Sequence, residues 1–129
     1  MNYINDLIPK DKFDTSGISL LTTIDVDEAE PILGVLLEWI QDINWPVAKE
    51  LLNVLPRFHS GLIPHIKAVL NSDDDIWKCW VLVMLKNFPP ETVSILSTEI
   101  KRIADSPTQT EILEGANEYA KELLYGECI

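Results

Sequence analysis

Helix-breaking residues divide this sequence into short segments, and this punctuation limits the possible folds more than any other feature. Proline, glycine, asparagine and aspartate recur at short intervals, and the apolar residues between them follow helical spacing. No segment alternates with a period of two for long enough to predict a strand. We therefore expect an all-α fold. The expected helices cover residues 17–24, 27–40, 44–55, 63–70, 75–88, 91–103 and 108–124.

A faint repeat suggests how these helices pack. Asn44-Trp45-Pro46 and Asp75-Ile76-Trp77 each open a long helix that ends near proline and is followed by a second helix, and Trp45 and Trp77 are 32 residues apart. One such pair cannot bury its apolar face alone, so stacking would supply the core. We expect a short right-handed stack of antiparallel helix pairs, a HEAT-like α-solenoid.

The length of 129 residues predicts one domain. Within residues 1–129 we expect an ordered N-terminal arm (1–16), stacked helices (17–125) and a frayed tail (126–129). Leu7, Ile8 and Phe13 are the expected anchors of the arm.

The charge balance restricts the partners. Ten basic and 21 acidic residues give a net charge of -11. This charge repels phosphate backbones and anionic lipids, so we expect neither nucleic-acid nor membrane binding. The N-terminus has no basic region followed by an apolar one, which predicts no signal peptide. We expect a cytoplasmic protein without a cofactor.

Two cysteines fit a reducing compartment. Cys79 lies in a strongly apolar helical segment, where a buried free thiol is expected, and Cys128 lies in the tail. A disulfide between them is the second interpretation. A catalytic thiolate would need an electropositive, partly exposed setting, which the residues around Cys79 do not predict.

Three strings carry a resemblance: LIPKDKFD (7–14), LLEWIQDINWPVAKELL (36–52) and DDDIWKCWVLVML (73–85). Together they resemble a bacterial domain family of unknown function with a HEAT-like helical-hairpin fold, from the arm through PTQTE (107–111). The resemblance implies a small helical domain and supplies no activity or catalytic residue. Similar helical domains occur among immunity proteins that neutralise bacterial toxins, which is an analogy of fold and charge.

Neither the histidines nor the aspartate triplet predicts a metal site. His59 and His65 are six residues apart with Gly61 and Pro64 between them, so they do not share a helix face as a metal-binding pair would. The run Asp73-Asp74-Asp75 lacks the spacing of a calcium loop and is better explained as a helix cap. We predict no catalytic residue and no metal ligand.

The last predicted helix carries four glutamates, Glu111, Glu114, Glu118 and Glu122, at spacings that place them on one face. The opposite, buried face would consist of Ile112, Ala116, Ala120 and Leu123. Taken alone, the acidic row is explained by a solvated amphipathic helix. Together with the net charge, it also suggests a surface that attracts a basic partner.

The tryptophans offer a second candidate contact. Trp39, Trp45, Trp77 and Trp80 could form an aromatic cage, although core packing is the commoner role for such residues. Trp45 differs because it begins a helix beside a loop, where it could anchor a partner.

These features favour a non-catalytic protein-binding module with a basic protein partner. Its sharpest form is an immunity-type inhibitor of a basic toxin such as a nuclease, with Glu111, Glu114, Glu118 and Glu122 replacing substrate phosphates and Trp45 as anchor. The alternatives are a scaffold or adaptor subunit of a larger complex and, with less support, a small metal-dependent hydrolase using His59 or His65. The sequence makes no prediction about the oligomeric state.

Overall fold

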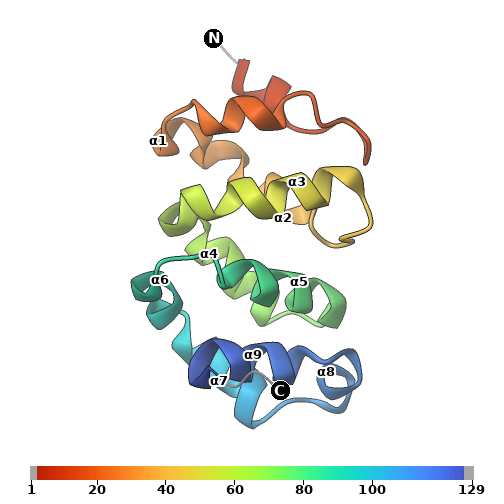
Figure 1. The fold of residues 1–129 in the computed structure, drawn as a ribbon, viewed down its shortest axis with the longest axis vertical. Coiled ribbons are helices and arrows are strands. Elements are labelled where there is room, and N and C mark those ends of the chain that lie inside the picture. The colour runs from red at the N-terminus through yellow and green to blue at the C-terminus, as the bar shows by residue number, and fades with distance from the viewer. Residues whose placement is uncertain (1–2, 127–129) are drawn as a thin grey trace. The chain divides into compact units, whose positions relative to one another are not determined.

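The computed structural model describes residues 3–126 and contains only helices, with no strand in that range. The all-α prediction is confirmed. The chain divides into two compact units, residues 1–65 and 66–129, and the division falls within α4 (His59–Leu70). Figure 1 labels the α-helices.

The first unit combines short α-helices with 3₁₀ helices. Its elements are η1 (Tyr3–Leu7), η2 (Ile18–Thr22), α1 (Val26–Ala29), η3 (Glu30–Ile32), α2 (Leu33–Glu38), α3 (Pro46–Val54) and η4 (Leu55–Phe58). The helix expected over 27–40 is thus interrupted by η3. Pro31 lies in η3 and has no amide hydrogen to donate to an α-helical ladder, which accounts for the interruption.

The core of the first unit forms where α3 packs against η2 and η4. Leu21, Leu51 and Phe58 are fully buried there. The Arg57 guanidinium donates from Nη1 to the carbonyl oxygen of Leu21 at 3.1 Å, which joins η4 to η2.

The N-terminal arm is tied to the first unit. The backbone N–H of Val47 donates to the carbonyl oxygen of Lys12 at 3.2 Å, and Leu7 is buried. The expectation that Phe13 anchors the arm is wrong, because its side chain is 68% exposed. Its ring lies instead beside the Lys12 ammonium, 5.4 Å from the ring centroid.

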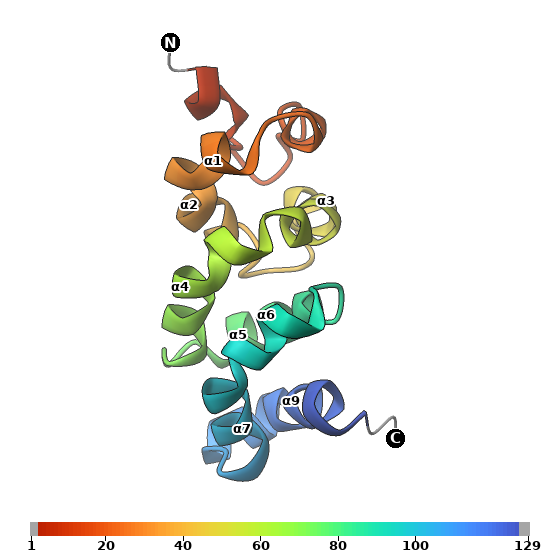
Figure 2. The same ribbon diagram turned by 90° about the vertical axis from the view of Figure 1, so that its left-hand side faces the viewer.

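The second unit contains only α-helices among its described helical elements. Beyond α4 these are α5 (Asp75–Leu85), α6 (Pro90–Ile95), α7 (Ser97–Asp105), α8 (Gln109–Glu114) and α9 (Ala116–Tyr125). Helix α9 packs against α7 and α5, and α8 lies beside α5 and α9; both ribbon views show α7 next to α9 (Figures 1 and 2). The most apolar helix, α5, buries Val81, Leu82 and Leu85 completely.

Several helix boundaries differ from the prediction. Helix α4 begins at His59 instead of residue 63, with Pro64 inside it, and α5 ends at Leu85 instead of residue 88. The helix expected over 91–103 is divided at Leu96 into α6 and α7. The helix expected over 108–124 is divided at Gly115, whose φ of 85° lies in the left-handed region and ends α8. Glycine adopts this conformation without the steric cost of a Cβ atom, so Gly115 can change the direction of the chain.

Candidate protein-binding site

The most concentrated group of charges in the second unit surrounds Glu111. Thr108 caps α8: its hydroxyl oxygen accepts from the Glu111 N–H at 3.1 Å, and the Thr108 N–H donates to Glu111 Oε1 at 2.8 Å. This reciprocal capping box places Glu111 in the first turn with its side chain directed back toward the start of the helix. The helix start expected at residue 108 is confirmed, with Thr108 as the N-cap residue of α8.

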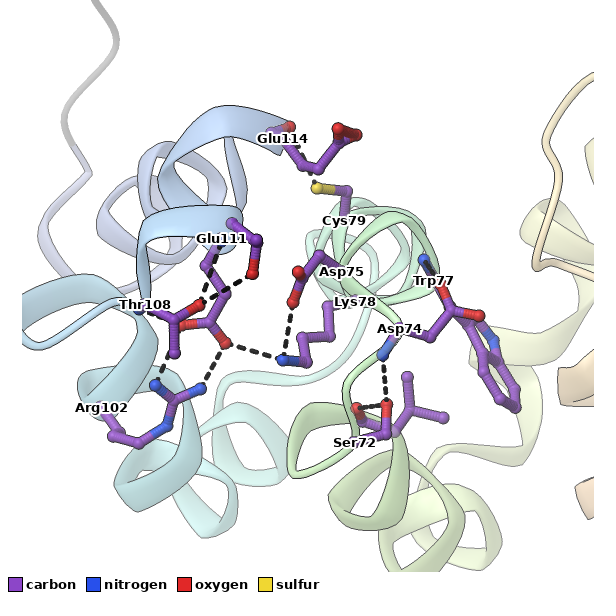
Figure 3. A network of polar contacts seen from close by, with 12 residues as sticks. Ser72, Asp74, Asp75, Trp77, Lys78, Cys79, Arg102, Thr108, Glu111 and Glu114 are labelled. Atoms are coloured by element: carbon purple, nitrogen blue, oxygen red, sulfur yellow. Dashed lines mark hydrogen bonds and ion pairs between the residues drawn. The ribbon is translucent and has the colours of Figure 1, made fainter.

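Two cations reach the Glu111 carboxylate from other helices (Figure 3). From α7, the Arg102 guanidinium donates to both carboxylate oxygens, at 2.9 Å to Oε1 and 2.5 Å to Oε2. From α5, Lys78 Nζ donates to Oε2 at 2.8 Å and to Asp75 Oδ1 at 2.9 Å. The side chain of Glu111 is fully buried and that of Lys78 is 4% exposed.

These contacts determine the ionisation of the cluster. Burial alone raises the pKa of the Glu111 carboxyl, but the hydrogen bonds from Arg102, Lys78 and the Thr108 N–H outweigh burial and lower the pKa to about 2. Burial likewise lowers the pKa of Lys78, but its hydrogen bonds to Glu111 and Asp75 raise that pKa above its ordinary value. Glu111 and Lys78 are therefore both charged at neutral pH.

The cluster connects α5, α7 and α8 and does not present Glu111 to a partner. The expectation that Glu111 lies on an exposed acidic face is wrong, because the capping box and two cations hold it in the interior. Ile112, expected on the buried face, is 52% exposed, whereas Ala116 and Ala120 are buried as predicted. The break at Gly115 separates Glu111 and Glu114 on α8 from the α9 residues.

The other three predicted glutamates differ in whether a cation pairs with their carboxylate. Glu114 and Glu118 are exposed, and no described Lys or Arg forms an ion pair with either. Glu122 pairs with Lys86, Nζ to Oε1, at 2.8 Å. Its charge is therefore partly neutralised within the second unit.

A surface depression lies between the start of α5 and α8, next to the charge cluster, and Asp75 of that cluster is part of its lining. Its lining includes Asp73, Asp74, Ile76, Leu113 and Glu114. Ile76 is 50% and Leu113 74% exposed, which is unusual for two large apolar side chains sharing one depression. The carboxylates around them make the depression both acidic and apolar, and we name it the α5–α8 depression.

Sequence reasoning identified only part of the α5–α8 depression. It included Glu114 in the acidic row and interpreted the aspartate triplet as a helix cap. The cap is confirmed for Asp74, whose Oδ1 accepts from the Trp77 N–H at 3.0 Å, while Asp73 is exposed. A Thr-x-x-Glu capping box can be read from residues 108–111, and it would have shown that a new helix start directs Glu111 away from Glu114.

Trp45 lies in the first unit, where it is the N-cap residue of α3. Its ring meets that of Trp39 edge to face, with centroids 5.7 Å apart and planes at 65°. Both tryptophans are half-buried and line a second depression together with Val35, Glu38 and Gln41. Trp45 is therefore accessible from solvent, as an anchor would need to be.

Cys79 is a buried free cysteine, as expected; its thiol donates to the Glu114 carbonyl oxygen at 3.3 Å, and burial raises its pKa to about 11. Cys128 lies outside the described residues. Within residues 3–126 no group of three or more His, Cys, Asp or Glu side chains is arranged to hold a metal ion. No helix in that range is long and apolar enough to cross a membrane.

Fold and site together define a small all-helical protein with an acidic and apolar depression on its second unit and an aromatic depression on its first. The chain belongs to the family described as "Domain of unknown function (DUF5071)", whose model matches residues 7–124. A comparison with curated proteins finds no match.

Proposed function

We propose that this chain is a non-catalytic protein-binding module whose partner is a basic protein. The observation that supports it most is the α5–α8 depression, whose lining combines exposed Ile76 and Leu113 with the carboxylates of Asp73 and Glu114. A contact surface with an apolar centre and a charged rim is typical of protein interfaces. The net charge of -11 extends the attraction for a basic partner over a longer range.

Each component has a distinct part in the proposed binding. Asp73 and Glu114 attract the partner and limit it to basic surfaces, because such charges raise association rates and select against acidic proteins. Leu113 supplies apolar area that is removed from water in the complex, which slows dissociation. The buried cluster at Glu111 keeps α8 in place so that Leu113 and Glu114 are presented together.

The sharper proposal is an immunity-type inhibitor of a basic toxin such as a nuclease. Glu114, Glu118 and Glu122 would take the place of substrate phosphates in the toxin's active site, and Trp45 would add an anchor. Glu111 has no part in it, because its carboxylate is buried and paired.

We also propose that the helices form a short right-handed HEAT-like stack of antiparallel pairs, as one domain of a bacterial cytoplasmic protein. The 32-residue spacing of Trp45 and Trp77 and the packing of α9 against α7 support the repeat. The buried free thiol of Cys79 supports a reducing compartment.

A scaffold or adaptor subunit is the second candidate. It is favoured by the exposed apolar side chains of the second unit, since Ile95 and Ile112 are each more than half exposed in addition to Leu113. Such side chains would be covered in a permanent complex. This candidate predicts capture that does not weaken with salt.

The test is capture of partners from a lysate of the source organism by the tagged chain, at about 50 mM and about 500 mM salt, with identification by mass spectrometry. We expect a basic protein that is retained at low salt and reduced at high salt. A triple variant, Asp73→Asn, Leu113→Ser and Glu114→Gln, should lose it.

The matched control changes the same residue types in the first unit: Asp27→Asn, Leu20→Ser and Glu30→Gln, all exposed. It should capture the partner like the wild type. Equal capture by both triple variants would contradict the assignment to the α5–α8 depression.

A further inference from the structure

The depression around Trp39 and Trp45 contains polar groups with no partner of their own. Trp39 is the C-cap residue of α2 and Trp45 the N-cap residue of α3, so the segment between the two helices brings the rings together. Within residues 3–126, neither indole N–H and no carboxylate oxygen of Glu38 has a hydrogen-bond or ion-pair partner. Two indole rings and one carboxylate without a described partner therefore line the same depression.

This combination is suited to a cation. The faces of tryptophan rings carry negative electrostatic potential and attract ammonium and guanidinium groups, and an adjacent carboxylate adds a charge-assisted hydrogen bond. A planar guanidinium stacks on an indole and presents several N–H donors in one plane, whereas an ammonium is compact and strongly hydrated. Glu38 and Gln41 both provide oxygen acceptors for those donors.

We infer that this depression binds an arginine side chain of a protein partner. The chain's own arginines are engaged elsewhere: Arg57 donates to the Leu21 carbonyl oxygen and Arg102 to Glu111. The guanidinium therefore comes from another molecule. The inference rests on the proposed function in one respect: a basic protein partner would supply the arginine.

The binding site can be tested on the isolated chain, without any partner. The probe is N-acetyl-arginine amide, added to ¹⁵N-labelled protein while the four indole N–H signals are followed by NMR. Trp39→Phe and Trp45→Phe variants assign the two signals of the depression. We expect these two signals to shift with a saturable concentration dependence while those of Trp77 and Trp80 stay in place.

A second probe tests whether binding depends on the charge of the arginine side chain or only on its shape. N-acetyl-citrulline amide has nearly the same shape as the arginine probe but carries no charge. It should bind about two- to five-fold more weakly, which is the ratio expected for an exposed cation–π contact. Glu38→Gln should weaken arginine binding to a similar extent. Glu30→Gln, which removes an equal charge from an exposed position outside the depression, should leave the affinity unchanged.

Three results would overturn the inference: no saturable shift of the Trp39 and Trp45 signals, equal binding of the citrulline and arginine probes, or equal effects of Glu38→Gln and Glu30→Gln. The NMR titration contains no protein partner, so its failure would contradict only the arginine site. The proposed function would be contradicted separately, if the capture experiment recovered no basic protein.

Discussion

The Arg102 guanidinium and the Glu111 carboxylate form two parallel hydrogen bonds, from Nη1 to Oε1 at 2.9 Å and from Nη2 to Oε2 at 2.5 Å. A paired contact of this kind fixes orientation as well as distance. Lys78 donates to the same carboxylate from α5. One buried glutamate thus joins three helices of the second unit, and the first two predictions concern it.

Glu111→Gln should destabilise the protein by about 3 kcal/mol, because removing one partner from a buried ion pair leaves the buried ammonium of Lys78 without its main counter-charge. The free energy of unfolding is measured by urea denaturation. Glu118→Gln, at an exposed position on α9, should change it by less than about 0.5 kcal/mol. Similar stabilities of the two variants would argue against a structural role for Glu111.

The Glu111 carboxylate should also make stability depend on acidity. Its pKa falls from an ordinary 4.5 to about 2 in the folded chain, so its contribution is complete above about pH 5 and is lost as the pH falls through 2. The shift corresponds to about 3 kcal/mol. The difference in unfolding free energy between wild type and Glu111→Gln, followed from pH 7 to pH 3, should shrink. A difference that stays constant would show that ionisation of Glu111 contributes nothing.

Cys79 should be unreactive in the native protein, because burial raises its pKa to about 11 and the thiolate is therefore scarce at neutral pH. In a Cys128→Ser variant, Cys79 is the remaining thiol. Labelling with a thiol reagent at pH 8 should be slow in buffer and fast in denaturant. Rapid labelling of the native variant would mean that Cys79 is accessible.

Gly115→Ala should destabilise the protein by about 1 kcal/mol, because φ at this position is 85° and a Cβ atom is strained there. No heavy atom lies near enough to contact that Cβ, so the cost is conformational. Gly115→Asn should cost less, since asparagine tolerates the left-handed region better. Thermal unfolding compares the variants, and equal loss in both would contradict this explanation.

Features that depend on neighbouring residues could be predicted from the sequence. The sequence predicts the aspartate triplet before α5 as a helix cap and a helix start at residue 108, because cap residues precede the helix that they begin. Pro46 marks a helix start for the same reason, whereas the helix expected to begin at residue 91 begins one residue earlier, at Pro90. The burial of Cys79 followed from the apolar residues around it.

Features that depend on distant residues could not be predicted in the same way. The partners of Glu111 are 33 and 9 residues away, at Lys78 and Arg102, and helical spacing has no information about either. The row of glutamates was extended across Gly115 because a spacing of three and four residues assumes one continuous helix. Gly115, in the left-handed region, ends that helix. The α5–α8 depression combines residues of two separate helices, which helical spacing within one segment cannot predict.

The most direct test of the proposed function is the dissociation constant of the purified complex with a captured basic partner, measured by calorimetry at low and high salt. The Asp73→Asn, Leu113→Ser, Glu114→Gln variant should bind at least about tenfold more weakly than wild type at low salt, a loss of about 1.4 kcal/mol. The variant with matched changes in the first unit should bind like wild type. Equal affinities of the two variants, or an affinity that does not change with salt, would contradict binding of a basic protein at the α5–α8 depression.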